Sequence, residues 1–160
     1  MAKKQPVKPS ASRRTVINRR ARFDYELGDE LVVGLSLTGP EVRAARDGHV
    51  QLKGAYVQIN KAELWLQGAS FSLKLNERGK PGARTIDTSP KKLLAHRKQI
   101  DSLVAAKAGG MTIVPLKLKT AGRFIKLVIA VGKGKKRYDK RETLKRRDQE
   151  REAQRMVKLG

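Results

Sequence analysis

The chain contains no cysteine, and this absence excludes several kinds of site. Without thiols there are no disulfides, no thiolate zinc site and no cysteine nucleophile. The two histidines, His49 and His96, lie in different segments and have no carboxylates at metal-ligand spacing. Gly132 and Gly134 lack the spacing of a P-loop. We therefore expect no metal, no cofactor and no catalytic residues.

Long apolar runs are absent as well. No segment approaches the roughly 20 apolar residues that a helix needs to span a bilayer, and the N-terminus lacks the hydrophobic segment of a signal peptide. A helix lying on a membrane surface would carry Trp, Phe and Leu opposite a basic face, and neither end of the chain has this pattern. We expect a cytoplasmic protein with no membrane partner.

Acidic residues are scarce: 15 Asp and Glu stand against 37 Lys and Arg, which gives a net charge of +22 over 160 residues. Residues 1–22 carry eight basic and no acidic groups, and residues 133–160 carry twelve basic and five acidic groups. The segment between them is also basic, with seventeen against ten. Such a charge distribution attracts phosphate-bearing ligands, so nucleic acid is the expected partner class.

The length fits one domain with extensions. Residues 1–15 mix Pro, Ser, Lys and Arg without periodicity, which predicts a disordered basic arm. Residues 16–132 hold most of the apolar residues and form the predicted body. The tail, 133–160, has too few apolar side chains to offset its own ordering entropy. We expect it to be disordered alone and to fold only on a polyanionic partner.

Strands are predicted wherever apolar and polar residues alternate between turn residues. They span 23–37 (two strands, broken at Gly28-Asp29), 55–59, 63–67, 71–75, 112–119 and 123–131. The stretch 30–37 is apolar enough to be buried on both faces of a sheet. In the last hairpin, the inward side chains are expected to be Val114, Leu116, Leu118, Ile125, Leu127, Ile129 and Val131. Trp65 faces away from Leu64 and Leu66, and a lone Trp more often packs against neighbours than stacks on a base.

Two helices are predicted. Thr38 and Glu41 form a capping box for a helix over 39–47, which explains Glu41 more simply than catalysis does. The second helix opens at Ser89-Pro90, after a loop over 76–89, and ends before Gly109-Gly110. Together, these elements predict a mainly β fold: a small antiparallel barrel with two or three short helices and a basic C-terminal tail. Barrels of this kind often present a face to oligonucleotides.

Several sequence strings resemble the family of SsrA-binding proteins, also called small protein B. They are Asn18–Arg22 (NRRAR), Leu37–Arg43 (LTGPEVR), Lys92–Leu94 (KLL), Thr112–Leu118 (TIVPLKL) and Gly132–Arg141 (GKGKKRYDKR). The resemblance runs in order from about Val16 to the end of the chain, and the last string is the most specific. The resemblance implies an oligonucleotide-binding-like barrel in a monomeric, non-catalytic protein. The implied function is to bind transfer-messenger RNA and carry it into stalled ribosomes for trans-translation.

The resemblance also implies site residues. Those that would bind the tRNA-like domain of transfer-messenger RNA are Asn18, Arg19, Arg20, Arg22, Glu41, Lys92 and Leu94, joined at the start of the tail by Lys133, Lys135 and Lys136. The tail would reach the decoding centre, enter the empty messenger channel and become helical. The tail residues implied in ribosome binding are Tyr138, Asp139, Lys140, Arg141, Lys145, Arg146 and Arg147.

The chain departs from the family pattern in two places. Val32 stands where relatives usually carry an acidic residue, and the string Thr88–Lys92 has lysines where arginines are commoner. Lysine keeps the charge but loses the two-pronged hydrogen bonding of arginine. Two other functions remain as alternatives: a basic structural protein that binds ribosomal RNA, and an RNA-modifying enzyme, for which no residue constellation is present.

Overall fold

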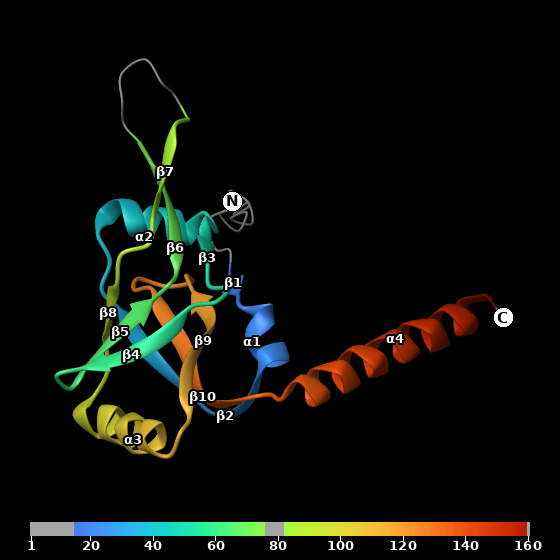
Figure 1. Cartoon of the computed structure of the whole chain (residues 1–160). Helices are drawn as coiled ribbons and strands as arrows, with labels where there is room; N and C mark the ends of the chain where they lie inside the picture. The colour runs from blue at the N-terminus through green and yellow to red at the C-terminus, as the bar shows by residue number, and fades with distance from the viewer. Residues whose placement is uncertain (1–14, 76–81, 160) are drawn as a thin grey trace, which may run out of the picture.

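The structure, a computed structural model, describes residues 15–75 and 82–159, except for the side chains of residues 137–139 and 159. Within these residues it contains ten strands and four helices. The fold is mainly β, as predicted, and Figure 1 shows a body built of strands from which one long helix projects. No helix of the described residues is both long enough and apolar enough to cross a membrane.

Six strands pair edge to edge in a closed ring. In ring order they are β2 (Tyr25–Leu35), β8 (Lys91–Leu94), β5 (Glu63–Gln67), β4 (Tyr56–Asn60), β9 (Thr112–Lys119) and β10 (Lys126–Gly134). All of these pairs are antiparallel, and the ring closes where Val57 of β4 meets Ile113 of β9. The short strand β1 (Val16–Ile17) adds to β9. Closure leaves few unpaired backbone groups at sheet edges.

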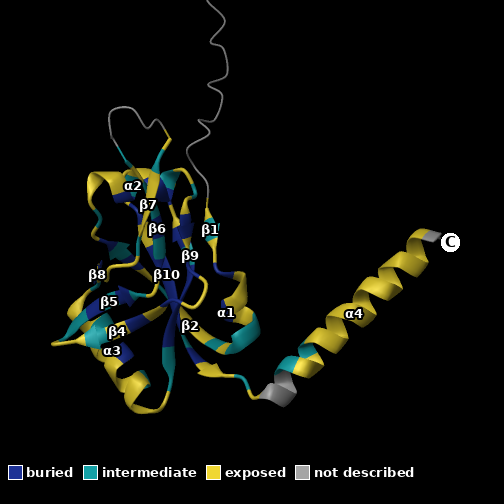
Figure 2. Ribbon diagram, turned by 45° about the horizontal axis from the view of Figure 1, so that its top comes forward, coloured by how far each residue is buried: buried dark blue, intermediate teal, exposed yellow. Residues whose placement is uncertain are grey.

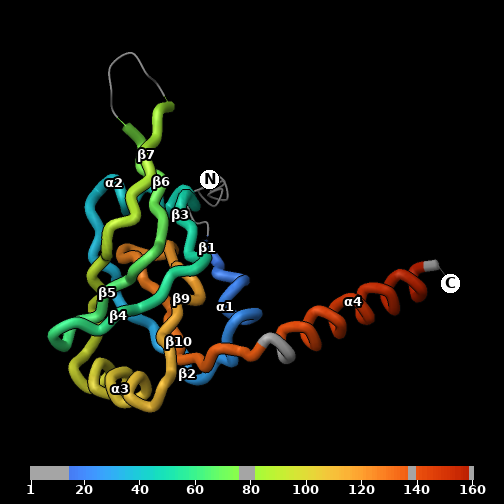
Figure 3. The backbone as a smooth tube through the Cα atoms, in the orientation of Figure 1, coloured from blue at the N-terminus to red at the C-terminus, as the bar shows by residue number. Residues whose placement is uncertain are grey.

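A second sheet lies beside the ring. It contains β3 (Val50–Gln51), β6 (Ser70–Lys74) and β7 (Arg84–Asp87). The helix α2 (Gly39–Arg46) packs against β6, and Figures 1 and 3 show α2 and the β6–β7 hairpin at the top of the body. The loop predicted over 76–89 is therefore wrong for residues 84–87, and residues 76–81 lie outside the described part.

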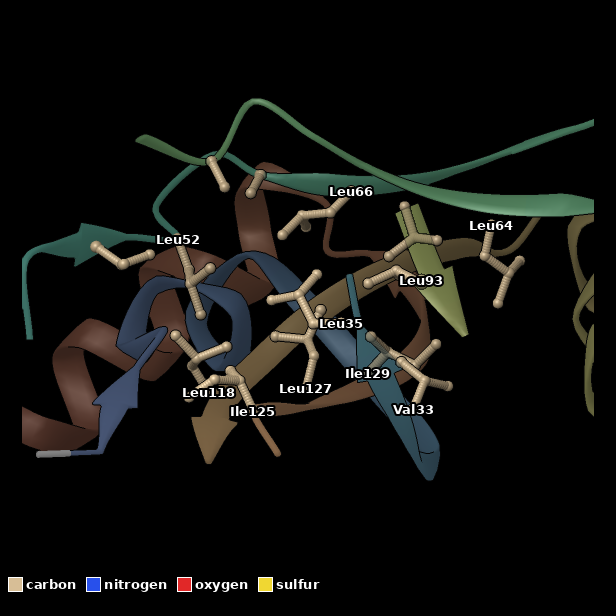
Figure 4. Close-up of a cluster of buried hydrophobic side chains, with 14 of the residues drawn as sticks. Val33, Leu35, Leu52, Leu64, Leu66, Leu93, Leu118, Ile125, Leu127 and Ile129 are labelled. Carbon is tan, nitrogen blue, oxygen red and sulfur yellow. The ribbon is translucent and has the colours of Figure 1, made fainter. Parts of the chain in front are cut away.

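The ring encloses the main core. Leu64, Leu66, Leu127 and Ile129 are 0% exposed, and Figure 4 shows side chains from several strands of the ring meeting there. Each such side chain contributes on the order of 1.5–3 kcal/mol through burial. The alternation predicted for the β4–β5 hairpin is confirmed, because Trp65 is only partly buried on the opposite side of the strand. The turn between these strands places Lys61 at a φ of 49°.

A smaller core lies outside the ring, where α1 (Arg19–Asp24) covers β9 and β10. Its buried members are Ala21, Val114, Leu116, Val128 and Ala130. The register of β9 and β10 shifts by one residue between Val128 and Ile129, so that Leu116 is the extra residue of a bulge beside Pro115. A bulge tolerates proline, which cannot donate to the ladder. The prediction that Val114 and Leu116 face the same core as Leu118 is therefore wrong.

The first strand differs from the prediction. The structure has one continuous strand, β2, preceded by the helix α1, whereas two strands were predicted over 23–37. The expectation of burial on both faces is also wrong: Val33 and Leu35 are buried, but Val32 is 43% exposed. Val32 therefore lies on the outer surface of the ring.

The helix predicted from Ser89 is wrong at its beginning. Residues 91–94 form β8, which completes the ring by pairing with β5 and β2, and the helix α3 (Arg97–Ala108) starts only after His96. Leu93 points into the core and Leu94 away from it, which is the alternation of a strand. The backbone N–H of His96 donates to the side chain of Gln99 at 3.0 Å, so a capping box fixes the start of α3.

The C-terminal segment is where the helix content of the structure differs most from the prediction. Residues Arg137–Leu159 form α4, a helix of 23 residues, so the described residues have four helices rather than the two or three short ones predicted. Figure 2 shows α4 extending away from the body and exposed along most of its length. The strand predicted to end at Val131 continues as β10 to Gly134, and α4 begins at Arg137.

Candidate nucleic-acid interface

A cationic groove runs beside α1 on the outer surface of the ring. Its volume is about 820 Å³. Five basic side chains and one acidic side chain line it: Arg19 and Arg22 of α1, Lys117 and Lys119 of β9, Arg147 of α4, and Glu30 of β2. Arg22 lies 4.0 Å from Glu30, whereas Arg19, Lys117 and Lys119 form no ion pair with any described residue. These three cations are therefore free to meet anions from outside.

An apolar hollow continues the groove toward α3. Val32 borders both, and Leu94 and Lys126 line the hollow, which has a volume of about 430 Å³. Leu94 is 54% exposed and is paired directly with Gly34. A Cβ at Gly34 would lie 3.2 Å from the Cβ of Leu94, so the absence of a side chain makes room for Leu94. We call the groove and this hollow together the cationic face.

Asn18 supports the cationic face from below. Its side chain is 7% exposed, and its Nδ2 donates to the backbone oxygens of Leu52 at 3.1 Å and Pro115 at 2.9 Å. Its backbone N–H donates to Leu116 at 2.7 Å. These bonds tie the start of α1 to β9 and to the segment after β3. Its Oδ1 is buried and has no hydrogen-bond partner among the described residues. The amide thus orients the arginines of α1.

Glu41 lies away from the cationic face. It is 8% exposed, and its carboxylate accepts from the Thr38 backbone N–H at 2.9 Å and from Lys91 Nζ at 2.5 Å. Lys91 also donates to Asp87 at 2.6 Å and to Ser89 at 2.9 Å. Asp87 is the last residue of β7, and Ser89 lies in the turn that follows it. We call Glu41, Asp87, Ser89 and Lys91 the buried ion network, and it joins α2 to β7 and β8.

Proton equilibria in this network favour its charged form. Burial alone would lower the pKa of Lys91, but hydrogen bonds to Asp87 and Glu41 outweigh it and raise the pKa above its ordinary value. The hydrogen bond from Lys91, followed by those from Ser89, holds the pKa of Asp87 well below its usual range. Glu41 and Lys91 therefore have a structural role, because they join α2 to β7 and β8. Glu41 does not lie beside the other residues implied in RNA binding.

Lys92 and Leu94 share the outward side of β8. Lys92 is paired in register with Trp65 and forms an ion pair of 3.2 Å with Glu63, in which both side chains are about half exposed. An exposed pair of this kind contributes about 0–1 kcal/mol, so Lys92 can exchange Glu63 for another anion at little cost.

The start of α4 packs against α1. Lys135 donates from its backbone N–H to the backbone oxygen of Asp24 at 2.9 Å and from Nζ to that of Arg22 at 3.2 Å. The carboxylate of Asp24 lies 3.2 Å from both Arg20 Nε and Lys140 Nζ. Beside it, the Phe23 ring is 5.1 Å from the Arg20 guanidinium and 6.0 Å from Lys140 Nζ.

Arg147 is the third cation at this ring, 6.0 Å from its centroid, and it also lines the cationic groove. We call Arg20, Phe23, Asp24, Lys140 and Arg147 the Phe23 cluster. It directs one side of α4 toward the groove.

The remaining implied residues lie along β10 and α4. Lys133, Lys136, Arg141, Lys145 and Arg146 are exposed, and the side chains of Tyr138 and Asp139 lie outside the described part. Sequence reasoning missed Lys117, Lys119 and Lys126 on the cationic face, although basic residues at alternate positions of a strand were a readable signal. It also missed Phe23. No group of three or more His, Asp or Glu among the described residues could hold a metal ion.

A ring of strands with free cations on its outer face, joined to a long cationic helix, defines a protein that binds a polyanion. Comparison with known proteins shows the family within this class to which the chain belongs. Residues 15–159 match the SmpB protein family. The SsrA-binding protein of Rhodopseudomonas palustris (strain TIE-1) is 42% identical over 146 residues, which cover 88% of this chain and 89% of the relative. The chain belongs to the SmpB family, the SsrA-binding proteins.

Further relatives agree. The SsrA-binding protein of Lactobacillus delbrueckii subsp. bulgaricus is 42% identical over 146 residues, covering 89% of this chain and 92% of the relative. That of Shouchella clausii (strain KSM-K16) is 40% identical over 142 residues, covering 88% and 89%. A solved structure described as "tmRNA-SmpB: a journey to the center of the bacterial ribosome" contains a chain that is 30% identical to this one, with a TM-score of 0.58. The alignment covers 81% of this chain and 94% of that one.

Proposed function

We propose that this protein is a non-catalytic RNA-binding factor, which binds the tRNA-like domain of transfer-messenger RNA and delivers it to stalled ribosomes for trans-translation. The observation that carries the proposal is the cationic face, found on a chain that belongs to the SmpB family. The similar solved structure, described as tmRNA-SmpB and the bacterial ribosome, supports both partners. The same relatives do not favour a structural ribosomal protein. In this proposal the protein acts in the cytoplasm as a monomer.

The cationic face offers two kinds of contact to a folded RNA. Arg19, Lys117 and Lys119 form no ion pair within the described part of the chain and would bind backbone phosphates. Val32 and Leu94 form an apolar border beside them, which suits an unstacked loop base or a sugar edge. Asn18 serves this face by holding α1 in place. In this view the ring of strands acts as an oligonucleotide-binding-like barrel.

The other implied RNA-binding residues divide between direct and indirect roles in this proposal. Arg22 and Lys92 would contact RNA directly, and so would Lys133 and Lys136, because their side chains are exposed. Arg20 and Lys135 would act by fixing α1 against the start of α4. Glu41 would act only through the buried ion network, by holding β8 and therefore Leu94 in register.

The tail, 133–160, is proposed to be disordered alone and to be helical in the messenger channel of the ribosome, near the decoding centre. From Arg137 on, its described residues form α4, whose larger apolar side chains, Leu144, Met156 and Val157, are at least 48% exposed. A helix that buries so little apolar surface gains little from packing and is marginal in water. The tail residues proposed to bind the ribosome are Tyr138, Asp139, Lys140, Arg141, Lys145, Arg146 and Arg147. The basic arm predicted over 1–15 lies outside the described residues, apart from Thr15.

The proposal is tested by measuring the affinity of the whole protein for transfer-messenger RNA over a range of salt concentrations. The variant Arg19→Gln/Lys119→Gln should bind at least about tenfold more weakly, and the slope of log K against log salt should fall by about 0.7–0.9 for each phosphate contact removed. The matched control, Lys98→Gln/Lys107→Gln on α3, removes the same charge from side chains that line neither the groove nor the apolar hollow. Equal losses in both variants, or an affinity insensitive to salt, would contradict the proposal.

A further inference from the structure

A second basic hollow lies between α2 and the β6–β7 hairpin. It has a volume of about 230 Å³ and is lined by Arg43 of α2, Lys74 of β6 and Arg84 of β7, with Asp47 as the one acidic side chain among its lining residues. Arg43 and Lys74 form no hydrogen bond or ion pair with another described residue through their side chains. The chain thus places three cations from three separate elements around one hollow.

Two of these cations, Arg43 and Lys74, form no side-chain bond that holds the described fold together. Lys74 and Arg84 are direct cross-strand partners in the antiparallel β6–β7 pair. Like charges in such a pair destabilise the sheet unless an anion lies between them. Arg46, one turn after Arg43 on α2, provides a contrast: its guanidinium donates to the backbone oxygens of Thr120, Gly122 and Arg123. Arg46 therefore serves the fold, whereas Arg43 is left open.

The hollow is held in shape by the groups around it. Arg84 donates from Nε to Ser72 Oγ at 2.8 Å and from Nη2 to the Ser72 backbone oxygen at 2.5 Å, which fixes the direction of its guanidinium. The buried ion network links Glu41 of α2 through Lys91 to Asp87 at the end of β7. Since Glu41 is two residues from Arg43, and Asp87 three from Arg84, this network holds the segments that carry these two arginines next to each other.

We propose that Arg43, Lys74 and Arg84 form a second phosphate-binding site, which takes the backbone of ribosomal RNA while the cationic face holds transfer-messenger RNA. This inference rests on the proposed function. The two sites share no lining residue, and Figures 1 and 3 show α2 and the β6–β7 hairpin at the far end of the body from α3 and from the start of α4. Both can therefore be occupied at once. Transfer-messenger RNA already occupies the cationic face in the proposed function, so the RNA at the second site is ribosomal RNA.

The test variant is Arg43→Gln/Lys74→Gln in the full chain. Arg84 is kept, because its bonds to Ser72 hold the hairpin. The matched control is Lys98→Gln/Lys107→Gln. Binding to ribosomes lacking messenger, measured by co-sedimentation, should weaken at least about tenfold in the test variant, and the salt dependence should become shallower by about 0.7–0.9 for each phosphate contact removed. Affinity for free transfer-messenger RNA should change less than about twofold, because the hollow lies away from the cationic face and distant sites act independently.

Each measurement has a result that would overturn the proposal. Equal weakening in the control would show a general effect of net charge. A loss of transfer-messenger RNA binding with ribosome binding unchanged would assign the hollow to the first RNA. A lower melting temperature in the test variant would show that the two side chains serve the fold; we expect the same or a higher value, since like charges are removed. If the wild-type protein failed to bind transfer-messenger RNA, the proposed function would fail, and the ribosome measurement would remain readable.

Discussion

Lys140, near the start of α4, lies 3.2 Å from the carboxylate of Asp24, the last residue of α1. This pair, with Phe23 beside it, is the point where the tail meets the body. The side chains of both partners are about a third exposed or less. An ion pair near the surface contributes about 0–1 kcal/mol, so the contact can orient α4 without locking it. The arrangement suits the proposed role of the tail, in which α4 detaches from the body to enter a channel.

We expect Phe23→Leu to widen the range of orientations of α4, because a cation–π interaction at an exposed site is worth about 0.5–1 kcal/mol and leucine cannot form one. The chain has no cysteine, so spin labels on cysteines introduced at Ser102 and Gln154 would report a single distance. The distribution should broaden in this variant. Phe124→Leu is the control, since Phe124 also lies under an arginine, at 5.6 Å, but that arginine is its neighbour Arg123 in the turn between β9 and β10 and not a residue of α4. Equal distributions in both variants would contradict this role of Phe23.

The buried ion network should make Lys91→Met strongly destabilising. The change leaves Glu41 as a buried carboxylate without its cation, and loss of one partner of a buried pair costs about 3–5 kcal/mol. Lys92→Met removes the neighbouring lysine, which has only an exposed pair, and should cost less than about 1 kcal/mol. Urea unfolding of both variants at neutral pH measures the difference. Similar midpoints would mean that the network contributes little.

The same network predicts the pH dependence of stability. The lowered pKa of Asp87 contributes stability that is present above its unfolded value of about 4 and is lost as the pH falls toward the folded pKa. The raised pKa of Lys91 contributes stability that is present below about pH 10 and is lost as the pH rises through the folded pKa. Lys91→Met should flatten both limbs of the stability curve. If the stability curve of Lys91→Met kept both limbs, groups other than Asp87 and Lys91 would cause the pH dependence.

The sequence predicted the elements whose signals are local. The β4–β5 hairpin follows from alternation around a turn, and α2 from a capping box within four residues. It failed where distant residues decide. In α1 only Ala21 is buried, so no apolar periodicity marks the helix, which depends on Asn18 bonding to Leu52 and Pro115.

The failure at β8 has the same cause. Lys91 points inward on that strand, and an inward lysine is possible only because Glu41, 50 residues earlier, receives it. No local pattern could show this pairing. Of the residues implied in RNA binding, Arg19, Arg22 and Leu94 lie on one face, whereas Glu41 does not, and the RNA contacts themselves stay a prediction.

Leu94→Ala should weaken binding of transfer-messenger RNA without destabilising the protein. The side chain is 54% exposed, and surface changes of this kind usually alter stability by less than about 0.5 kcal/mol. Loss of an apolar contact of this size with a base should cost about 1–2 kcal/mol of binding, or roughly five- to thirtyfold in affinity. Val104→Ala on α3, also an exposed aliphatic residue, is the control. Unchanged affinity in Leu94→Ala would remove the apolar hollow from the RNA contact.

Removal of α4 should separate the two proposed activities. A chain ending at Lys136 keeps the whole of β10 and loses only Arg147 from the cationic groove. Its affinity for transfer-messenger RNA should fall less than about tenfold, as expected for loss of one phosphate contact among several. Tagging of nascent chains on stalled ribosomes in a purified translation system should be abolished. Retained tagging would show that the tail is not needed in the messenger channel.

Gly132 and Gly134 offer a test of why the GKGK string contains glycine. A Cβ at Gly132 would lie 3.1 Å from Tyr25 Cβ and 3.3 Å from Leu27 Cδ2, whereas nothing lies within 4 Å of one at Gly134. Gly132→Ala should therefore destabilise the fold by about 1–3 kcal/mol through overpacking. Gly134→Ala should be neutral or slightly stabilising, by up to about 1 kcal/mol.

Urea unfolding measures both variants, and RNA binding is measured beside it. If the two glycines instead allowed close approach of an RNA phosphate, both variants would fold like the wild type and both would bind RNA more weakly. The structure favours the first result at Gly132, because its backbone pairs with Leu27 within the β10–β2 ladder, next to a register shift after Ala130. At that position the strand needs a residue without a side chain, whichever ligand is bound.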